Sequence, residues 1–432
     1  MKAECGYFAS AQLLVDAIRS SRRGRLVSHR RLPLTRALAR TTAVLLTMMS
    51  TTGCQSTSSG FLRGDDNALV SQHPTISAEA RSGRGRVLMN EPFDDVDTQL
   101  SQVAGASRRM VYQSIQGISG RATEVSGAAF MPKGLPPGGG WPIIAIGHGT
   151  TGIAQDCGVS SAADLKGLGD QVAAFLSEGY AVAITDYEGL GAGGPHLYLE
   201  PHSAAYNVFD SVRALRALFP AASAKWIAFG GSQGGQAAWA VDEFDADYGD
   251  GLDLVGSVAI APAVNLVSAA EESFTGTLTG DQLGAMPLVV VGLVRAYPEL
   301  RLDDYLHGRT RSNLEVIIGC GPNANSARGA TTAADVKPRN VSAAQALRDA
   351  LRRNALPQQP LSVPMLVING QRDTAIPQNW INGAVRRTCE MGGVVDHVEI
   401  STMSHLSAPP ADLVRRWIGA RFAGEPPEST CS

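Results

Sequence analysis

The hydrophobic positions of this chain follow two alternating periods from about residue 109 onward. Short, mostly apolar runs are typical of buried strands, and longer stretches with apolar residues every three to four positions are typical of amphipathic helices. We predict strands at 109–113, 122–131, 143–147, 181–186, 226–229, 255–261, 364–369 and 397–400. We predict helices at 169–178, 204–219, 236–247, 379–392 and 410–422. Apolar strands that alternate with helices indicate an α/β fold, in which a mostly parallel, doubly wound sheet is covered on both faces.

The alternation stops between about residues 264 and 356. This segment has helical periodicity at 281–295 and 343–353 and a turn-rich piece at 319–330, but no clear strand pattern. An insertion of this length between two strands is usually functional, so we expect a helical lid. The alternative is a surface excursion without a role of its own.

The N-terminal segment differs from the rest of the chain in charge. Residues 1–53 contain nine basic and two acidic residues, although the whole chain has a formal net charge of −3. The arginines precede an apolar run at 43–49 and then small residues before Cys54, which is the order of an export signal. A cysteine after small residues also resembles a bacterial lipobox, whose cysteine is acylated. The alternatives are a twin-arginine signal at Arg30-Arg31, whose following residues fit poorly, and a buried helix over 41–54, which the arginines disfavour.

We therefore expect an export signal at 1–53, a flexible tether at 54–85 and one domain at 86–432. The acidic body has no basic stripe, which argues against nucleic-acid binding. No apolar run reaches the roughly 20 residues of a membrane-spanning helix. Four cysteines remain after Cys5 and Cys54, and none forms a C-x-x-C pair that would suggest a metal site. In an oxidising compartment this even number favours two disulfides over a metal site; the cysteines are Cys157, Cys320, Cys389 and Cys431.

The most specific motif is Gly230-x-Ser232-x-Gly234. A short apolar run precedes it, and an alanine-rich helical run follows it. A serine on a sharp strand-to-helix turn exposes its hydroxyl, and glycines beside it avoid clashes with neighbouring backbone. The sequence therefore predicts a nucleophilic serine at Ser232.

A serine hydroxyl needs a base and a group that orients the base. Asp373 and His405 each follow a predicted strand after the insertion, and the order Ser232, Asp373, His405 is that of an α/β-hydrolase triad. His397 lies inside a strand, and His148, His196 and His202 precede the serine, so none of these four fits as the base. Among carboxylates, Asp186 or Glu188 is better placed to brace a loop, and Asp396 lies at the wrong end of its strand.

An oxyanion formed at the attacked carbonyl needs two donors already aimed at it. The backbone N–H of Gln233, directly after the nucleophile, should be the first. The second should come from the glycine-rich loop at 147–152, where glycines let the backbone approach a ligand. An ordinary glycine turn is the alternative for this loop.

Together these motifs resemble the secretory lipase family of lipase A-type α/β-hydrolases. The resemblance rests on Gly147-His-Gly-Thr-Thr-Gly152 with Asp156-Cys157, on Thr185-Asp-Tyr-Glu-Gly-Leu-Gly191 and on the serine motif, and it extends over about 105–430. It implies an α/β-hydrolase fold with a lid, Ser232, Asp373 and His405 as the triad, and Thr151 as the second oxyanion donor. It also implies the disulfides Cys157–Cys320 and Cys389–Cys431. The lipobox-like start is a departure, since fungal members are freely secreted.

We expect an exported serine carboxylic ester hydrolase, lipid-anchored in a bacterial cell envelope or secreted, that acts on lipid or other acyl esters without a metal or organic cofactor. Residues 286–294 fit an acyl-binding surface and a buried lid helix equally well. A serine peptidase or amidase on the same fold is one alternative, because the triad does not encode the scissile bond. The other is a surface-tethered binding protein without activity.

Overall fold

The computed structural model describes residues 74–431 of the chain. The predicted export signal, Cys54 and most of the predicted tether lie outside the described residues. The remainder of the predicted tether, however, contains the short helix α2 (Ala78–Ser82). Ser77 caps this helix by accepting a hydrogen bond from the backbone of Ala80, and Ala80 is buried. The folded body therefore begins before residue 86, where the sequence analysis placed its start.

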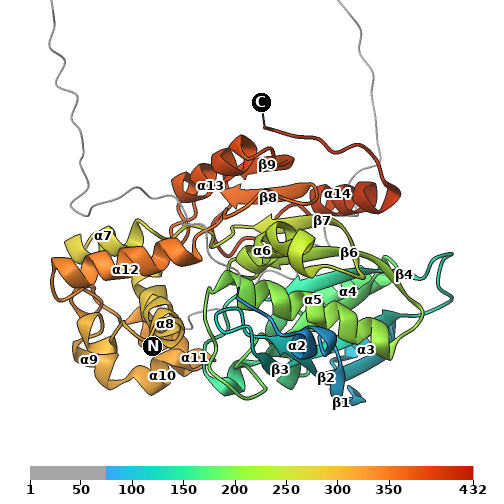
Figure 1. Cartoon of the computed structure of the whole chain (residues 1–432), viewed down its shortest axis with the longest axis horizontal. Helices are drawn as coiled ribbons and strands as arrows, with labels where there is room; N and C mark the ends of the chain where they lie inside the picture. Colours follow the sequence, from blue (N-terminus) through green and yellow to red (C-terminus); the bar gives the residue numbers. More distant parts are fainter. Residues whose placement is uncertain (1–73, 432) are drawn as a thin grey trace, which may run out of the picture. The chain divides into compact units, whose positions relative to one another are not determined.

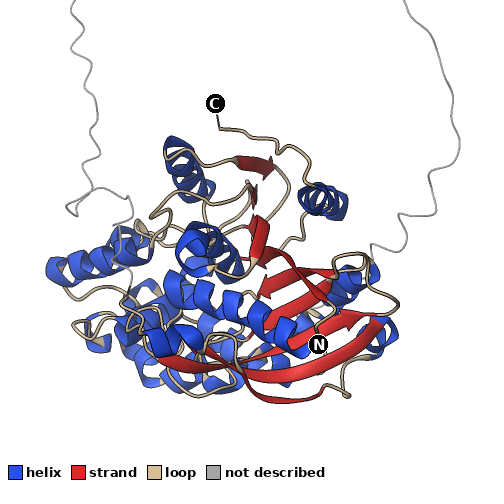
Figure 2. Cartoon of the chain, turned by 45° about the vertical axis from the view of Figure 1, so that its right-hand side comes forward, coloured by secondary structure: helices blue, strands red, loops and turns tan. Residues whose placement is uncertain are grey.

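A sheet, drawn red in Figure 2, forms the centre of the described chain. It has nine strands in the order β1-β2-β3-β5-β4-β6-β7-β8-β9. The strands are β1 (Val87–Pro92), β2 (Ala104–Ile115), β3 (Ala122–Pro132), β4 (Trp141–Gly147), β5 (Ala181–Thr185), β6 (Ala222–Gly231), β7 (Asp253–Ile260), β8 (Met365–Gly370) and β9 (Val395–Ile400). The pairs from β5 through β4, β6, β7 and β8 to β9 are parallel, and the pairs from β1 through β2 and β3 to β5 are antiparallel. The predicted mostly parallel sheet is confirmed.

Helices cover both faces of this sheet (Figure 1). One face packs against α5 (Pro201–Leu218), α6 (Gln233–Tyr248) and α13 (Gln378–Glu390), and the other against α3 (Thr98–Val103), α4 (Gly169–Ser177) and α14 (Ala411–Ala423). Successive side chains of a strand point to opposite faces of the sheet. Ile143 of β4 therefore packs against the face covered by α5, α6 and α13, and the adjacent Ile144 packs against the other face. Because both faces of these strands are buried, their sequences are nearly continuous apolar runs. Each fully buried side chain of this size contributes about 1.5–3 kcal/mol to the stability of the fold.

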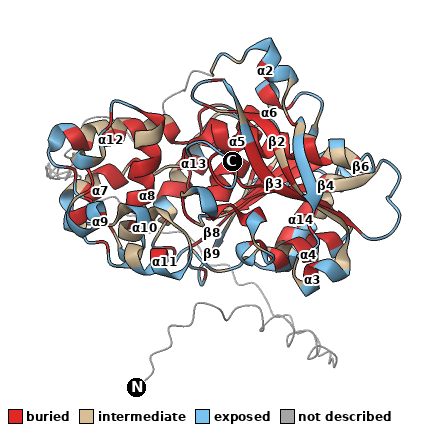
Figure 3. Ribbon diagram, turned by 90° about the horizontal axis from the view of Figure 1, so that it is seen from below, coloured by how far each residue is buried: buried red, intermediate tan, exposed pale blue. Residues whose placement is uncertain are grey.

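The segment between β7 and β8 is helical, as its loss of strand periodicity predicts. It contains α7 (Ala269–Thr275), α8 (Gly280–Ala296), α9 (Gly308–Ser312), α10 (Leu314–Ile318), α11 (Pro322–Gly329) and α12 (Val341–Asn354). The prediction of a turn-rich piece at 319–330 was wrong, because Pro322 begins α11 there. Figure 3 shows the inward faces of α8 and α12 as buried.

Most apolar residues of α8 are buried, including Met286, Leu288 and Val290, so this stretch is a core helix of the insertion. Within residues 74–431, no single helix is long and apolar enough to cross a bilayer. Only α7 and α8 together pass such a test, and they are bent by 111° relative to each other.

Strand β1 was missing from the sequence prediction. It is an edge strand whose residues are nearly all exposed, so it lacks the alternation that marks a half-buried strand. Antiparallel pairing with β2 holds these residues in a strand, although their own sequence does not predict one.

Candidate active site

Ser232 lies at the turn between β6 and α6, in a backbone conformation that residues with side chains rarely adopt (φ 56°, ψ −116°). The glycines of the motif make this turn possible. A Cβ atom on Gly234 would overlap the carbonyl oxygen of Gly147, and one on Gly230 would overlap the backbone of Gly234. Chain packing thus holds Ser232 at the carboxyl end of β6 with its side chain partly exposed.

The structure brings the three predicted side chains together in one hydrogen-bonded chain. Nε2 of His405 lies 2.9 Å from Oγ of Ser232, and Nδ1 lies 2.8 Å from Oδ2 of Asp373. Asp373 follows β8 and His405 follows β9, and both strands run parallel to β6 in the same sheet. Their carboxyl ends therefore meet at one edge, where residues separated by 173 positions in the chain come into contact.

Asp373 is held by more than its contact with His405. Its Oδ1 atom accepts hydrogen bonds from the backbone N–H groups of Ala375 (2.9 Å) and Ile376 (2.8 Å). Its side chain is fully buried, whereas that of His405 is 17% exposed. Oδ1 therefore binds the backbone of the loop and Oδ2 faces His405, so the orientation of the carboxylate is fixed.

The competing histidine and carboxylates have other partners. Nε2 of His397 lies 2.6 Å from Oδ1 of Asn369. Asp186 is fully buried and accepts hydrogen bonds from the hydroxyl of Ser126 and the backbone of Ser160, so it braces a loop, as expected. Asp396 lies near the start of β9, in register with Leu366.

The predicted oxyanion donors lie at the expected places in the chain. Gln233 is the first residue of α6, and the loop at 147–152 leaves β4, whose Gly147 is in register with Gly230 of β6. Within residues 74–431, the backbone N–H groups of Gln233 and Thr151 donate no hydrogen bond to another backbone carbonyl. The hydroxyl of Thr151 donates to the carbonyl of Cys157, which helps to fix the conformation of the loop.

A buried histidine behind Gln233 was not identified from the sequence as part of the site. Nδ1 of His196 lies 2.9 Å from the carbonyl oxygen of Glu188, and Nε2 lies 2.9 Å from Nε2 of Gln233. Burial lowers the pKa of His196 to about 3, so its ring is neutral at ordinary pH. Since Nδ1 must donate to the carbonyl, Nε2 accepts from the Gln233 amide, and the side chain after the nucleophile is anchored.

Both disulfides are present with the implied pairing, Cys157–Cys320 and Cys389–Cys431. The first connects the glycine-rich loop region with the insertion, beside hydrogen bonds from the backbone of Ile153 and Ala154 to the carbonyl of Ile318. Among the described residues, the one close group of possible metal ligands is Asp156 with Cys157 and Cys320, whose sulfurs are bonded to each other.

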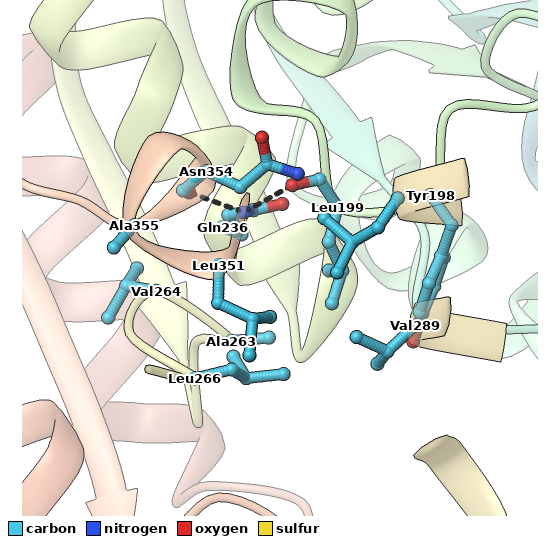
Figure 4. A pocket seen from close by; sticks show the side chains of 11 residues that line it. Tyr198, Leu199, Gln236, Ala263, Val264, Leu266, Val289, Leu351, Asn354 and Ala355 are labelled. Atoms are coloured by element: carbon cyan, nitrogen blue, oxygen red, sulfur yellow. Dashed lines mark hydrogen bonds between the residues drawn. The ribbon is translucent and has the colours of Figure 1, made fainter. Parts of the chain in front are cut away.

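A small, mostly apolar pocket, with space for little more than one water molecule, lies next to the nucleophile turn; Figure 4 shows the side chains that line it. Two of its lining residues flank Ser232: the backbone N–H groups of Gln236 and Ala263 both donate to the Ser232 carbonyl. Most of the other lining residues belong to the insertion; they are Val264, Leu266, Val289, Leu293, Leu351, Asn354 and Ala355. The insertion therefore forms one wall of the pocket beside the serine.

Comparison with known proteins relates the chain to lipases. The model of a family described as "Secretory lipase" matches residues 169–430. A Mycobacterium tuberculosis protein named "Probable inactive lipase" is 26% identical over 327 residues, which cover 68% of this chain and 69% of that protein. "Lipase A" of Arthroderma benhamiae is 24% identical over 285 residues, which cover 60% of this chain and 56% of that protein.

Solved structures share the fold at low sequence identity. Candida antarctica lipase A in its closed state has a TM-score of 0.66 at 18% identity, covering 83% of this chain and 86% of that one. The rice cell wall degrading esterase LipA from Xanthomonas oryzae has a TM-score of 0.61 at 20% identity, covering 79% and 95%. The predicted α/β-hydrolase fold is confirmed by these neighbours.

Proposed function

Because this chain belongs to the secretory lipase family, we propose that it is a serine carboxylic ester hydrolase that acts on lipid or other acyl esters through an acyl-enzyme. The observation that carries the proposal is the hydrogen-bonded chain from Ser232 through His405 to Asp373. All three side chains come from loops at the carboxyl ends of parallel strands, as α/β-hydrolase catalysis requires.

We assign each group a role in the proposed reaction from these distances. Oγ of Ser232 attacks the ester carbonyl while Nε2 of His405 accepts its proton, and Asp373 stabilises the imidazolium that results. The backbone N–H groups of Gln233 and Thr151 donate to the oxyanion. His405 then donates the proton to the departing alcohol, which leaves an acyl group on Ser232. A water molecule, deprotonated by His405, hydrolyses that ester in the second half of the reaction.

A chain-length series of p-nitrophenyl esters and triglycerides, measured above and below the substrate's solubility limit, tests the proposal. Hydrolysis should be lost in Ser232→Ala, and a rise in rate above the solubility limit would favour lipase over esterase. If the purified chain hydrolyses none of these esters, the proposal is wrong.

The relative named as inactive makes a non-catalytic binding protein the first alternative. The contacts of His405 with both Ser232 and Asp373 argue against it for this chain. A fluorophosphonate reacts with an activated serine, so labelling of the wild type but not of Ser232→Ala would exclude the binding protein. An amidase is the second alternative, and it requires turnover of aminoacyl-arylamides without turnover of p-nitrophenyl esters.

We also propose that the protein is exported and that Cys54 is acylated, so that the domain is tethered to a membrane. The family to which the chain belongs is described as secretory, and the two disulfides of the chain suit an oxidising compartment. Mass spectrometry of the protein recovered from a bacterial host tests this. A mature N-terminus at Cys54 with added acyl mass is expected, and Cys54→Ser should release the protein from membranes. An unmodified Cys54 would exclude the anchor.

A further inference from the structure

One arginine of the insertion contacts the backbone of two segments, each of which is linked to one of the proposed oxyanion donors. Nη1 of Arg295, in the last turn of α8, donates to the carbonyl oxygens of Ile153 (2.9 Å) and His196 (3.2 Å). Ile153 lies two positions after Thr151 in the chain, and the ring of His196 contacts the side chain of Gln233. The guanidinium of Arg295 therefore joins the segments that position the two donors.

The insertion holds both polar groups of the Ile153 backbone. The N–H of Ile153 donates to the carbonyl of Ile318 at 2.7 Å, and its carbonyl accepts from Arg295. The side chain of Ile153 is 1% exposed, so these contacts are shielded from water. The residue before it, Gly152, has a φ of 145°, a conformation that glycine adopts without a steric penalty. The path of the chain from Thr151 to Ile153 is thus fixed in part from outside, by the insertion.

Helix α8 comes close enough for this contact because Gly292 has no side chain. A Cβ atom on Gly292 would lie 2.7 Å from the carbonyl oxygen of Tyr198, and Gly292 lies three positions before Arg295, on the same face of the helix. Burial lowers the pKa of Arg295, but an arginine keeps its charge at ordinary pH. A charged donor forms hydrogen bonds about twice as strong as a neutral one. Arg295 is therefore well suited to hold two carbonyl groups in place.

We propose that Arg295 is a positioning residue for the oxyanion hole. Its guanidinium holds the loop that carries Thr151 and the segment that anchors Gln233 at the separation that the oxyanion needs. This inference rests on the proposed ester hydrolase function and gives the insertion a role in the reaction in addition to that of a lid. Arg295 acts through the two backbone N–H groups, so its loss should weaken binding of the oxyanion more than binding of the neutral substrate.

The test separates these two kinds of binding in Arg295→Met, made in the full chain. The kcat and KM of p-nitrophenyl butyrate are measured together with the Ki of an alkyl trifluoromethyl ketone and the Ki of the alcohol of the same skeleton. The ketone accepts the Ser232 hydroxyl and becomes a hemiketal oxyanion, which the alcohol cannot form. We expect kcat to fall and the ketone Ki to rise by similar factors, roughly 10- to 100-fold. KM and the alcohol Ki should stay within about threefold of the wild type.

Arg353→Met is the matched control, because Arg353 supports the same end of α8 without contacting the oxyanion loop in the described residues. Its guanidinium lies 2.7 Å from the carboxylate of Glu299 and 3.8 Å from the ring centroid of Tyr297, the residue after α8. The melting temperature is measured for every variant. Arg353→Met should lower the melting temperature and leave kcat and the ketone Ki unchanged, because its partners belong to the insertion.

Two further variants of Arg295 complete the test. Both hydrogen bonds come from Nη1, so the single ammonium group of Arg295→Lys can replace them and should restore part of the lost kcat and ketone affinity. If Arg295→Met does not fold, Arg295→Gln is measured instead, because its shorter amide remains polar but does not reach both carbonyls. If neither variant folds, the role of Arg295 is structural and the inference is wrong.

Two other results would overturn the inference. Either the folded variant keeps the kcat and ketone Ki of the wild type, or the ketone and the alcohol lose affinity by the same factor, as a merely structural role predicts. An activated serine adds to the ketone whichever acyl bond the enzyme cleaves, so this comparison is decisive even if no tested ester is a substrate. A wild type that hydrolyses no ester and binds the ketone no better than the alcohol would contradict the proposed function itself.

Discussion

The substitution Asp373→Asn should inactivate the enzyme by changing the tautomer of His405. The side chain cannot turn freely, because its Oδ1 atom accepts from the backbone N–H groups of Ala375 and Ile376. An asparagine must keep its oxygen there, since its amide nitrogen would otherwise face two donors. The new Nδ2 group therefore takes the position of Oδ2 of Asp373, which lies 2.8 Å from Nδ1 of His405.

The consequence for His405 is a specific loss of function. A donor facing Nδ1 makes that nitrogen an acceptor, so the proton of the neutral ring moves to Nε2. The Nε2 atom lies 2.9 Å from Oγ of Ser232 and can then no longer accept its proton. In a serine protease of another fold the equivalent change lowers kcat by about 10⁴, which corresponds to about 5 kcal/mol of transition-state stabilisation. We expect a loss of kcat/KM of this order here, with little loss of stability because the backbone contacts remain.

The assay is p-nitrophenyl ester hydrolysis with the melting temperature measured on the same samples. Asp396→Asn is the matched control, since Asp396 lies on the neighbouring strand β9 and was one of the competing carboxylates in the sequence; it should retain wild-type activity. The reasoning is refuted if Asp373→Asn folds and keeps kcat/KM within tenfold of the wild type while Ser232→Ala is inactive.

Three further predictions follow from contacts elsewhere in the structure. Burial raises the pKa of Glu243 to about 8, so the stability that it contributes is fully present below its ordinary pKa and is lost as pH rises toward 8. The melting temperature of Glu243→Gln should therefore fall less between pH 5 and pH 8 than that of the wild type; parallel curves would contradict this. Removing the Cys157–Cys320 disulfide, which closes a loop of 163 residues, should lower the free energy of unfolding by about 5 kcal/mol in the chain-entropy model. Removing the Cys389–Cys431 disulfide, which closes a loop of 42 residues, should lower it by about 4 kcal/mol, and urea denaturation measures both losses. His196→Phe should lower kcat by roughly 10- to 100-fold with little change in KM, because Gln233 loses its anchor, and an unchanged kcat would show that the contact is not needed.

The chain order of Ser232, Asp373 and His405 was sufficient to predict their meeting, because each follows a strand of one parallel sheet. In such a sheet the carboxyl ends of strands lie at a common edge, so position after a strand implies position in space. The same reasoning found the bracing role of Asp186 and the place of Gln233. The periodicity of the strands was thus enough to predict both the fold and the positions of the three proposed catalytic residues.

Features that depend on contacts between distant segments had no local signal. His196 and Gln233 are 37 positions apart, and only the packing of the loop after β5 against α6 brings them together. The edge strand β1 lacked periodicity because one-sided burial, which creates periodicity, is nearly absent there.

The ends of the insertion limit how a lid could move. Ala263 donates to the carbonyl of Ser232, and the backbone N–H of Leu356 donates to the carbonyl of Val264 at 2.7 Å, so the two ends are pinned to each other and to the nucleophile turn. Just beyond them, buried Glu243 of α6 accepts from the backbone of Gln358 at 2.8 Å. Movement that broke these contacts would release Ser232 from its strained conformation and expose a buried carboxyl group. An opening motion compatible with catalysis must therefore take place within residues 265–355, where α8 and α12 form the pocket wall, while the base of the insertion stays in position.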